Sequence, residues 1–145
     1  MAQDFSAPQY AKWGATPEER EQNILNSNFL KESCDNRDYD AAAHYLKGLI
    51  DKIPDAAESI YQRGAVVYKN KINRAKSVAE KNMFIDSLML MYDMRAQYFG
   101  DNVKPGKTAF ILDQKAREFL RYKPNDRKGI REAFRAAIAQ GGDST

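Results

Sequence analysis

The sequence contains little of the chemistry from which catalytic, metal-binding or cross-linked sites are built. One cysteine, Cys34, and one histidine, His44, occur among its 145 residues. A lone cysteine cannot form an intramolecular disulfide, and it does not distinguish a reducing from an oxidising compartment. A catalytic triad or a zinc site needs more than this one pair of side chains. We therefore expect no catalytic residues, no bound metal, no cofactor and no enzymatic activity.

Long apolar runs are also missing. No segment approaches the roughly 18 consecutive apolar residues of a membrane-spanning helix, so we expect no membrane span. The first residues, Met1 to Asp4, lack the charged region and the following apolar region of an export signal. An exported protein whose signal had been removed would also lack these features at its N-terminus. The compartment therefore stays open between the cytoplasm and the cell envelope.

Charge of one sign is not concentrated in any long block. The 23 Lys and Arg residues barely exceed the 20 Asp and Glu residues, which gives a formal net charge of +3. The surplus falls after residue 100, where ten Lys or Arg accompany six Asp or Glu. A solvated basic surface is the simpler interpretation, and an anion-binding surface is the alternative. The candidate anion-binding residues are Arg127, Lys128, Arg131 and Arg135.

What the sequence does contain is a series of helix starts and stops. Thr16-Pro17-Glu18-Glu19 and Ser77-Val78-Ala79-Glu80 both have the form of a capping box. Polar or proline-containing turns separate segments of helical periodicity, and no alternating run of strand length is present. The sequence therefore predicts an all-α protein with six helices, at residues 17–34, 39–53, 56–73, 78–99, 107–122 and 127–140.

These helices and their flanks define the expected organisation of the chain. Residues 1–15 are predicted to form an irregular arm with Phe5, Tyr10 and Trp13 as aromatic anchors, which pack on the first helix or, as the alternative, dock a partner. Residues 16–141 are predicted to form one helical domain of three antiparallel hairpins, because short turns join successive helices. Residues 142–145 follow two glycines and are expected to be a frayed tail.

A repeat spacing appears in the second predicted helix. Tyr39, Ala42, Leu46, Leu49 and Pro54 have the spacing of the second helix of a tetratricopeptide repeat, in which a small residue lets two helices approach closely. Further partial copies follow, although Arg63 occupies a position that is usually aliphatic. Their residues are Ile60, Gly64 and Val67 in the next helix, and Ile130, Ala133, Phe134 and Ala137 in the last. The chain resembles tetratricopeptide-repeat proteins over most of residues 17–141.

The resemblance implies a right-handed α-solenoid of about three helix hairpins. The segment from Glu80 to Gly100 is also similar to exported tetratricopeptide-like proteins of Gram-negative gut anaerobes. That similarity implies a periplasmic or other envelope location and a role in binding a protein or peptide. Proteins of this family bind partners on the concave face, where Tyr61, Tyr68 and Lys69 would be exposed. These three are the candidate partner-binding residues, with packing of the tyrosines as the alternative.

Three shorter patterns have ordinary structural explanations. The aspartates at 35, 38 and 40 lack the glycine and the glutamate of a calcium loop, so we expect a capped turn there. Gly106-Lys107-Thr108 matches only the end of a phosphate-binding loop, and could hold at most an anion at a helix start. Four methionines of the fourth helix fit core packing, with an adaptable binding surface as the alternative. They are Met83, Met89, Met91 and Met94.

These observations leave three functions in competition. The first is a scaffold that binds a protein or peptide on the concave face of stacked hairpins. The second is a nucleic-acid-binding or anion-binding helical domain that uses the basic C-terminal third. The third is self-association, because three hairpins are few to cover the end of a helical stack.

Overall fold

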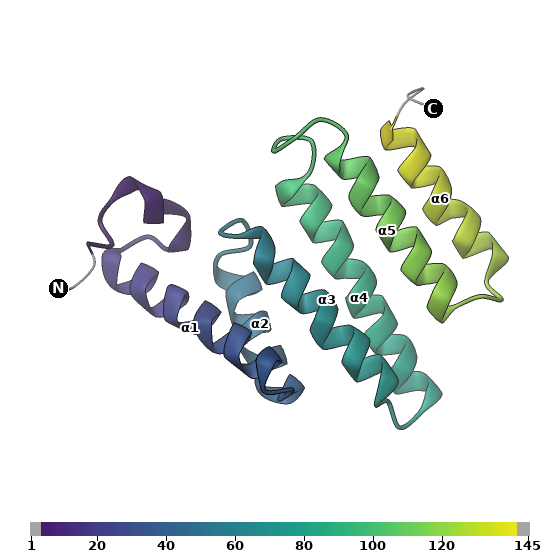
Figure 1. Ribbon diagram of the computed structural model, residues 1–145, viewed down its shortest axis with the longest axis horizontal. Coiled ribbons are helices and arrows are strands. Elements are labelled where there is room, and N and C mark those ends of the chain that lie inside the picture. Colours follow the sequence, from purple (N-terminus) through teal and green to yellow (C-terminus); the bar gives the residue numbers. More distant parts are fainter. Residues whose placement is uncertain (1–3, 142–145) are drawn as a thin grey trace. The chain divides into compact units, whose positions relative to one another are not determined.

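The computed structural model describes residues 4–141, and within them the protein is helical throughout (Figure 1). No strand occurs in this part of the chain. One 3-10 helix and six α-helices follow in order, with the bounds η1 Pro8–Trp13, α1 Pro17–Asp35, α2 Tyr39–Lys52, α3 Glu58–Asn73, α4 Val78–Phe99, α5 Lys107–Tyr122 and α6 Arg127–Gly141. The all-α prediction is confirmed.

Apart from three helix ends that shift by one residue, the predicted helices differ from these in two respects. The helix η1 lies inside the arm that the sequence suggested to be irregular. The sequence does not reveal this helix, because the run between Pro8 and Gly14 is too short to show helical periodicity. The described residues therefore hold seven helices, not six. The other difference is the start of α3, which begins at Glu58 and not near Ala56. The tail predicted at residues 142–145 lies outside the described residues.

The chain divides into two compact units, Met1–Val67 and Tyr68–Thr145, with the boundary inside α3. The single domain and the solenoid arrangement expected over residues 16–141 stay predictions. None of the helices in residues 4–141 is both long enough and apolar enough to cross a membrane.

The first unit contains a helix hairpin. The turn between α1 and α2 places Arg37 at a positive φ of 58°, and Asp38 Oδ1 then accepts a hydrogen bond of 3.2 Å from the Ala41 amide. This carboxylate caps α2, as expected for the aspartate cluster, and a cap of this kind contributes about 1 kcal/mol. Ala42 is completely buried, which is consistent with a close approach of the two helices.

The N-terminal arm is held against α1 through its main-chain carbonyls. Arg20 donates from Nη1 to the Phe5 carbonyl at 2.8 Å and from Nε to the Gly14 carbonyl at 2.9 Å. The buried Asn23 donates from Nδ2 to the Trp13 carbonyl at 2.7 Å. These bonds satisfy backbone acceptors on both sides of η1, so the arm packs on the first helix as expected.

The second unit places α4, α5 and α6 next to one another in chain order (Figure 1). Its core is formed mainly by α4, whose buried side chains are Ile85, Leu88, Met89, Met91 and Tyr92. The connection from α4 to α5 is closed by a reciprocal pair of hydrogen bonds. The Asp101 amide donates to Thr108 Oγ1 at 2.9 Å, and the Thr108 amide donates to Asp101 Oδ1 at 3.0 Å.

Candidate functional site

The two tyrosines expected on a binding face are core residues. Tyr61 is only 1% exposed, and its hydroxyl donates a hydrogen bond to the carbonyl of Pro54. Tyr68 is 7% exposed and lies 6.5 Å, centroid to centroid, from the ring of Phe84. The prediction that these tyrosines are exposed is therefore wrong. Sequence spacing cannot distinguish a tyrosine whose hydroxyl reaches water from one whose hydroxyl is satisfied inside the protein.

Lys69 is engaged within the second unit. Its Nζ lies 3.4 Å from Glu118 Oε1. Burial opposes the charge on Lys69, but the neighbouring Tyr92 and Glu118 outweigh that penalty and raise the pKa of Lys69. Burial in turn raises the pKa of Tyr92. Lys69 therefore has local partners that an incoming ligand would have to displace.

The four candidate anion-binding residues do lie together. Arg127, Lys128, Arg131 and Arg135 are all exposed on α6. At 3.6 residues per turn, these positions fall on one side of the helix. We refer to these four residues as the basic stripe. None of them makes an ion pair or a side-chain hydrogen bond with the residues that the structure describes.

A groove of about 440 Å³ crosses the second unit. We call it the α4–α6 groove, because α4, α5 and α6 all line it. Met89 and Phe119 supply its largest apolar side chains, and α6 supplies a small-residue wall. The full lining is Asp86, Met89, Lys115, Phe119, Asp126, Gly129, Glu132, Ala133 and Ala136.

The close approach of α5 and α6 gives this groove its shape. A Cβ atom added at Gly129 would come within 2.6 Å of Phe119 Cζ, so the ring lies directly over the glycine. The Gly129 amide donates a hydrogen bond of 2.9 Å to Asp126 Oδ1, which caps the first turn of α6. Small residues at 129, 133 and 136 thereby leave open space that larger side chains would fill.

The charges around the groove are mainly negative. Asp86 and Glu132 are exposed and make no ion pair or side-chain hydrogen bond within residues 4–141. The one lysine of the lining, Lys115, is 2.7 Å from Asp93 Oδ1 and is neutralised by that contact. The groove therefore combines an apolar floor with two carboxylates that make no ion pair within the described residues.

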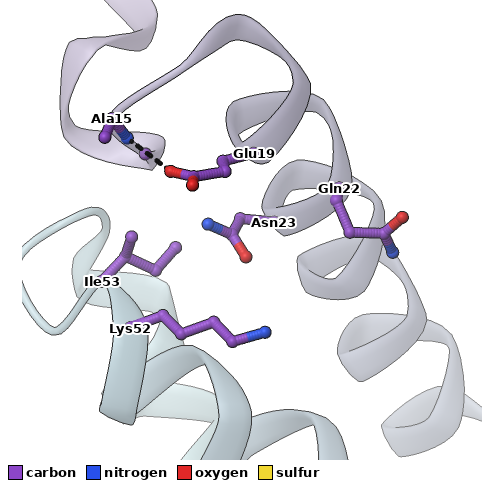
Figure 2. A pocket seen from close by; sticks show the side chains of 7 residues that line it. Ala15, Glu19, Gln22, Asn23, Lys52 and Ile53 are labelled. Carbon is purple, nitrogen blue, oxygen red and sulfur yellow. Dashed lines mark hydrogen bonds between the residues drawn. The ribbon is translucent and has the colours of Figure 1, made fainter.

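A second cleft, of about 450 Å³, lies in the first unit between the arm, α1 and α2 (Figure 2). Figure 2 shows Lys52 extending from the end of α2 across this cleft, near Asn23 of α1. The Glu19 carboxylate is turned away to the arm, where Oε2 accepts from the Ala15 amide at 3.0 Å. In the predicted capping box the Glu19 carboxylate would accept from the Thr16 amide. It accepts from the amide of Ala15 instead, one residue earlier. The polar groups of the cleft thus largely hold the arm in place.

Cys34 and His44, the cysteine and the histidine of the sequence, differ in their surroundings. Burial raises the pKa of the half-buried Cys34 thiol, which lowers the fraction present as the nucleophilic thiolate. His44 is exposed, with its ring 5.6 Å from that of Tyr45. The described residues include no group of three or more His, Cys, Asp or Glu side chains that could hold a metal ion. At the start of α5, the Asp101 carboxylate already occupies the Thr108 amide that an anion would use.

Comparison with models of protein families, with curated protein sequences and with solved structures finds no match for this chain. The class that the structure defines is an all-helical protein with a groove and a basic helix face. The resemblance to tetratricopeptide repeats stays a prediction.

Sequence reasoning missed the α4–α6 groove, although part of its signal was visible. Ala133 belongs to the repeat spacing of the last helix, whereas Gly129 and Ala136 belong to none of the sequence motifs. Their spacing of four and three residues places small side chains along one side of α6. The sequence gives no indication that Asp86 and Phe119 line the groove, because only the packing of α4 and α5 brings them to the same place.

Proposed function

We propose that this protein is a non-catalytic binding scaffold whose second unit takes a basic peptide segment in the α4–α6 groove. The observation that carries the proposal is the groove itself, with its apolar floor, small-residue wall and unpaired carboxylates. Peptide segments bind helical proteins by placing apolar side chains in such grooves. The negative rim favours Lys or Arg next to those apolar anchors, because complementary charge selects the partner.

The proposed site is the α4–α6 groove, whereas the sequence suggested the concave face of stacked hairpins. Tyr61 and Tyr68 are buried and offer little surface to a ligand, so the proposed site does not use them. A cell-envelope location belongs to the same proposal, and it rests on the similarity of residues 80–100 to exported proteins.

The test is selection from a displayed library of random peptides, followed by fluorescence anisotropy with the selected sequences. We expect enrichment of peptides that combine Lys or Arg with apolar residues. Asp86→Lys with Glu132→Lys should weaken their binding by about tenfold or more, since two favourable charge contacts become repulsive. Ala136→Trp should block the groove without changing its charge.

The matched control is Asp51→Lys with Asp55→Lys, which makes the same change in net charge at exposed positions of the first unit. This variant should bind the selected peptides like the wild type. Enrichment of peptides without basic residues, or equal loss in the groove variant and the control, would refute the proposed site.

The basic stripe of α6 supports a second candidate function, the binding of a nucleic acid or another polyanion. Four exposed cations without local partners are what such binding requires. If this function is correct, a short duplex will be retarded at low salt, and the variant Lys128→Glu with Arg131→Glu will lose that retardation. No retardation of the duplex by the wild type at low salt would exclude it.

A further inference from the structure

The first and last α-helices expose stripes of opposite charge. On α1, four of the exposed acidic residues make no ion pair or side-chain hydrogen bond within residues 4–141, namely Glu18, Glu21, Glu32 and Asp35, whereas the fifth, Glu19, accepts from the Ala15 amide. We call these four the acidic stripe. Their positions, together with the intervening Leu25 and Asn28, are separated alternately by three and four residues. That spacing places all six positions along one side of a helix.

The basic stripe of α6 has the same spacing. Lys128, Arg131 and Arg135 are followed by Ile138, again with alternating steps of three and four, and Arg127 lies beside them. Each stripe is also accompanied by an exposed apolar side chain, since Leu25 is 42% exposed and Ile138 is 62% exposed. Both helix faces thus combine charge of one sign with an aliphatic contact.

The two helices are matched in total charge. α1 holds five acidic and two basic residues, for a formal charge of −3. α6 holds four basic residues and one acidic residue, for a formal charge of +3. No member of either stripe makes an ion pair or a side-chain hydrogen bond within residues 4–141. Each stripe therefore keeps its charge available for a partner.

We infer that the acidic stripe of one molecule binds the basic stripe of another, so that the chain associates with a second copy of itself in a head-to-tail manner. Charge complementarity identifies the partner, because both matching surfaces are on the same chain. A polyanion would match the basic stripe alone and would be repelled by the acidic stripe. An interface between two different surfaces leaves one of each free, so association continues into rings or open chains.

The affinity should be low and dependent on salt. Exposed ion pairs are individually weak, so we expect association on the order of 100 μM at low ionic strength. Salt at about 1 M reduces the range of such interactions to about 3 Å and should return the protein to monomers. This inference is independent of the α4–α6 groove, and Ala136→Trp should leave self-association unchanged.

The test is a charge swap, measured as the apparent mass by light scattering and sedimentation at increasing concentrations of the full chain. One variant reverses the acidic stripe, with Glu18→Lys, Glu21→Lys and Glu32→Lys. The other reverses the basic stripe, with Lys128→Glu, Arg131→Glu and Arg135→Glu. Each variant alone should be monomeric, because its two stripes then carry the same sign. An equal mixture should associate, because each variant offers stripes complementary to those of the other.

The matched control carries Lys47→Glu, Lys76→Glu and Lys81→Glu at exposed positions outside both stripes. It makes the same change in net charge as reversal of the basic stripe, and it should associate like the wild type. Circular dichroism establishes that each variant is folded. If a reversal unfolds the chain, glutamine at the same positions should still weaken association.

Three results would overturn the inference. They are a wild type that stays monomeric up to about 1 mM at low salt, association that neither reversal reduces, and two reversed variants that fail to associate when mixed. Retardation of duplex DNA by a monomeric wild type, lost on reversal of the basic stripe, would assign that stripe to a polyanion instead.

Discussion

The helices α4 and α6 belong to the same unit and were predicted from the same kinds of signal, yet they differ in what they contribute. Five side chains of α4 are buried, whereas Ala137 is the one buried side chain of α6. The apolar residues of α4 surround much of the helix, while those of α6 occupy one side. The more buried helix, α4, supplies stability, and the more exposed helix, α6, supplies charge and surface for partners.

Shortening a leucine on each side of α4 should give the largest contrast. Leu88 is 0% exposed, and Leu88→Ala should lower the free energy of unfolding by about 2–5 kcal/mol, because it removes buried surface and leaves a cavity. Leu90 lies on the same helix but is 51% exposed, and Leu90→Ala should change stability by no more than about 0.5 kcal/mol. Denaturant titration measures both. Equal losses would contradict the difference in burial between Leu88 and Leu90.

A smaller effect distinguishes two helical glycines. Gly129→Ala should destabilise the protein by about 1 kcal/mol, because the new methyl group must displace the ring of Phe119 against a well-packed neighbour. Gly48 of α2 has no atom within 4 Å of an added Cβ, so Gly48→Ala should stabilise by about 0.5–1 kcal/mol through helix propensity. Thermal unfolding of the two variants provides the comparison. If both raised the melting temperature, α5 and α6 would not be in close contact at Gly129.

The smallest expected effect is a dependence on pH at Tyr68. Burial raises the pKa of Tyr68 from its usual 10.0, with a hydrogen bond to Ser87 acting in the opposite direction. The folded state therefore retains this proton more tightly than the unfolded state does. The corresponding stability is present below about pH 10 and is lost as the pH rises through the pKa of the folded state. Tyr68→Phe should reduce the loss of stability between about pH 9 and about pH 11, as measured by denaturant titration. An identical pH profile would show that Tyr68 reaches water.

The comparison between α4 and α6 also shows how far sequence reasoning reached. Five of the six predicted helices begin at the residue at which the structure begins them, and Thr16, Asp38 and Ser77 mark three of those starts through local capping bonds. The segment from Leu88 to Tyr92 is apolar throughout, and every residue of it except Leu90 is buried. Of its methionines, Met89 and Met91 are buried and Met83 is exposed, so neither a pure core role nor a pure surface role describes the group.

The candidate site was harder to predict, and Tyr61 shows the reason. Its position in the repeat spacing suggested a concave surface, whereas its hydroxyl is bonded to the carbonyl of Pro54 inside the first unit. The basic residues of α6 form a local pattern on one side of one helix, so the sequence alone groups them, and their role in binding an anion stays a prediction. Asp86 and Phe119 belong to different helices, and their meeting in the α4–α6 groove was not available from either segment alone.

Local sequence is enough to establish the helical class, the positions of the turns and the opposite charges of α1 and α6, because these depend on residues within a few positions of one another. Packing between helices was needed to establish which tyrosines are enclosed, which glycine lies against Phe119 and where a groove opens. Those features depend on side chains from helices that are distant in the sequence, and hydrophobic periodicity indicates that a face is buried without indicating what it is buried against.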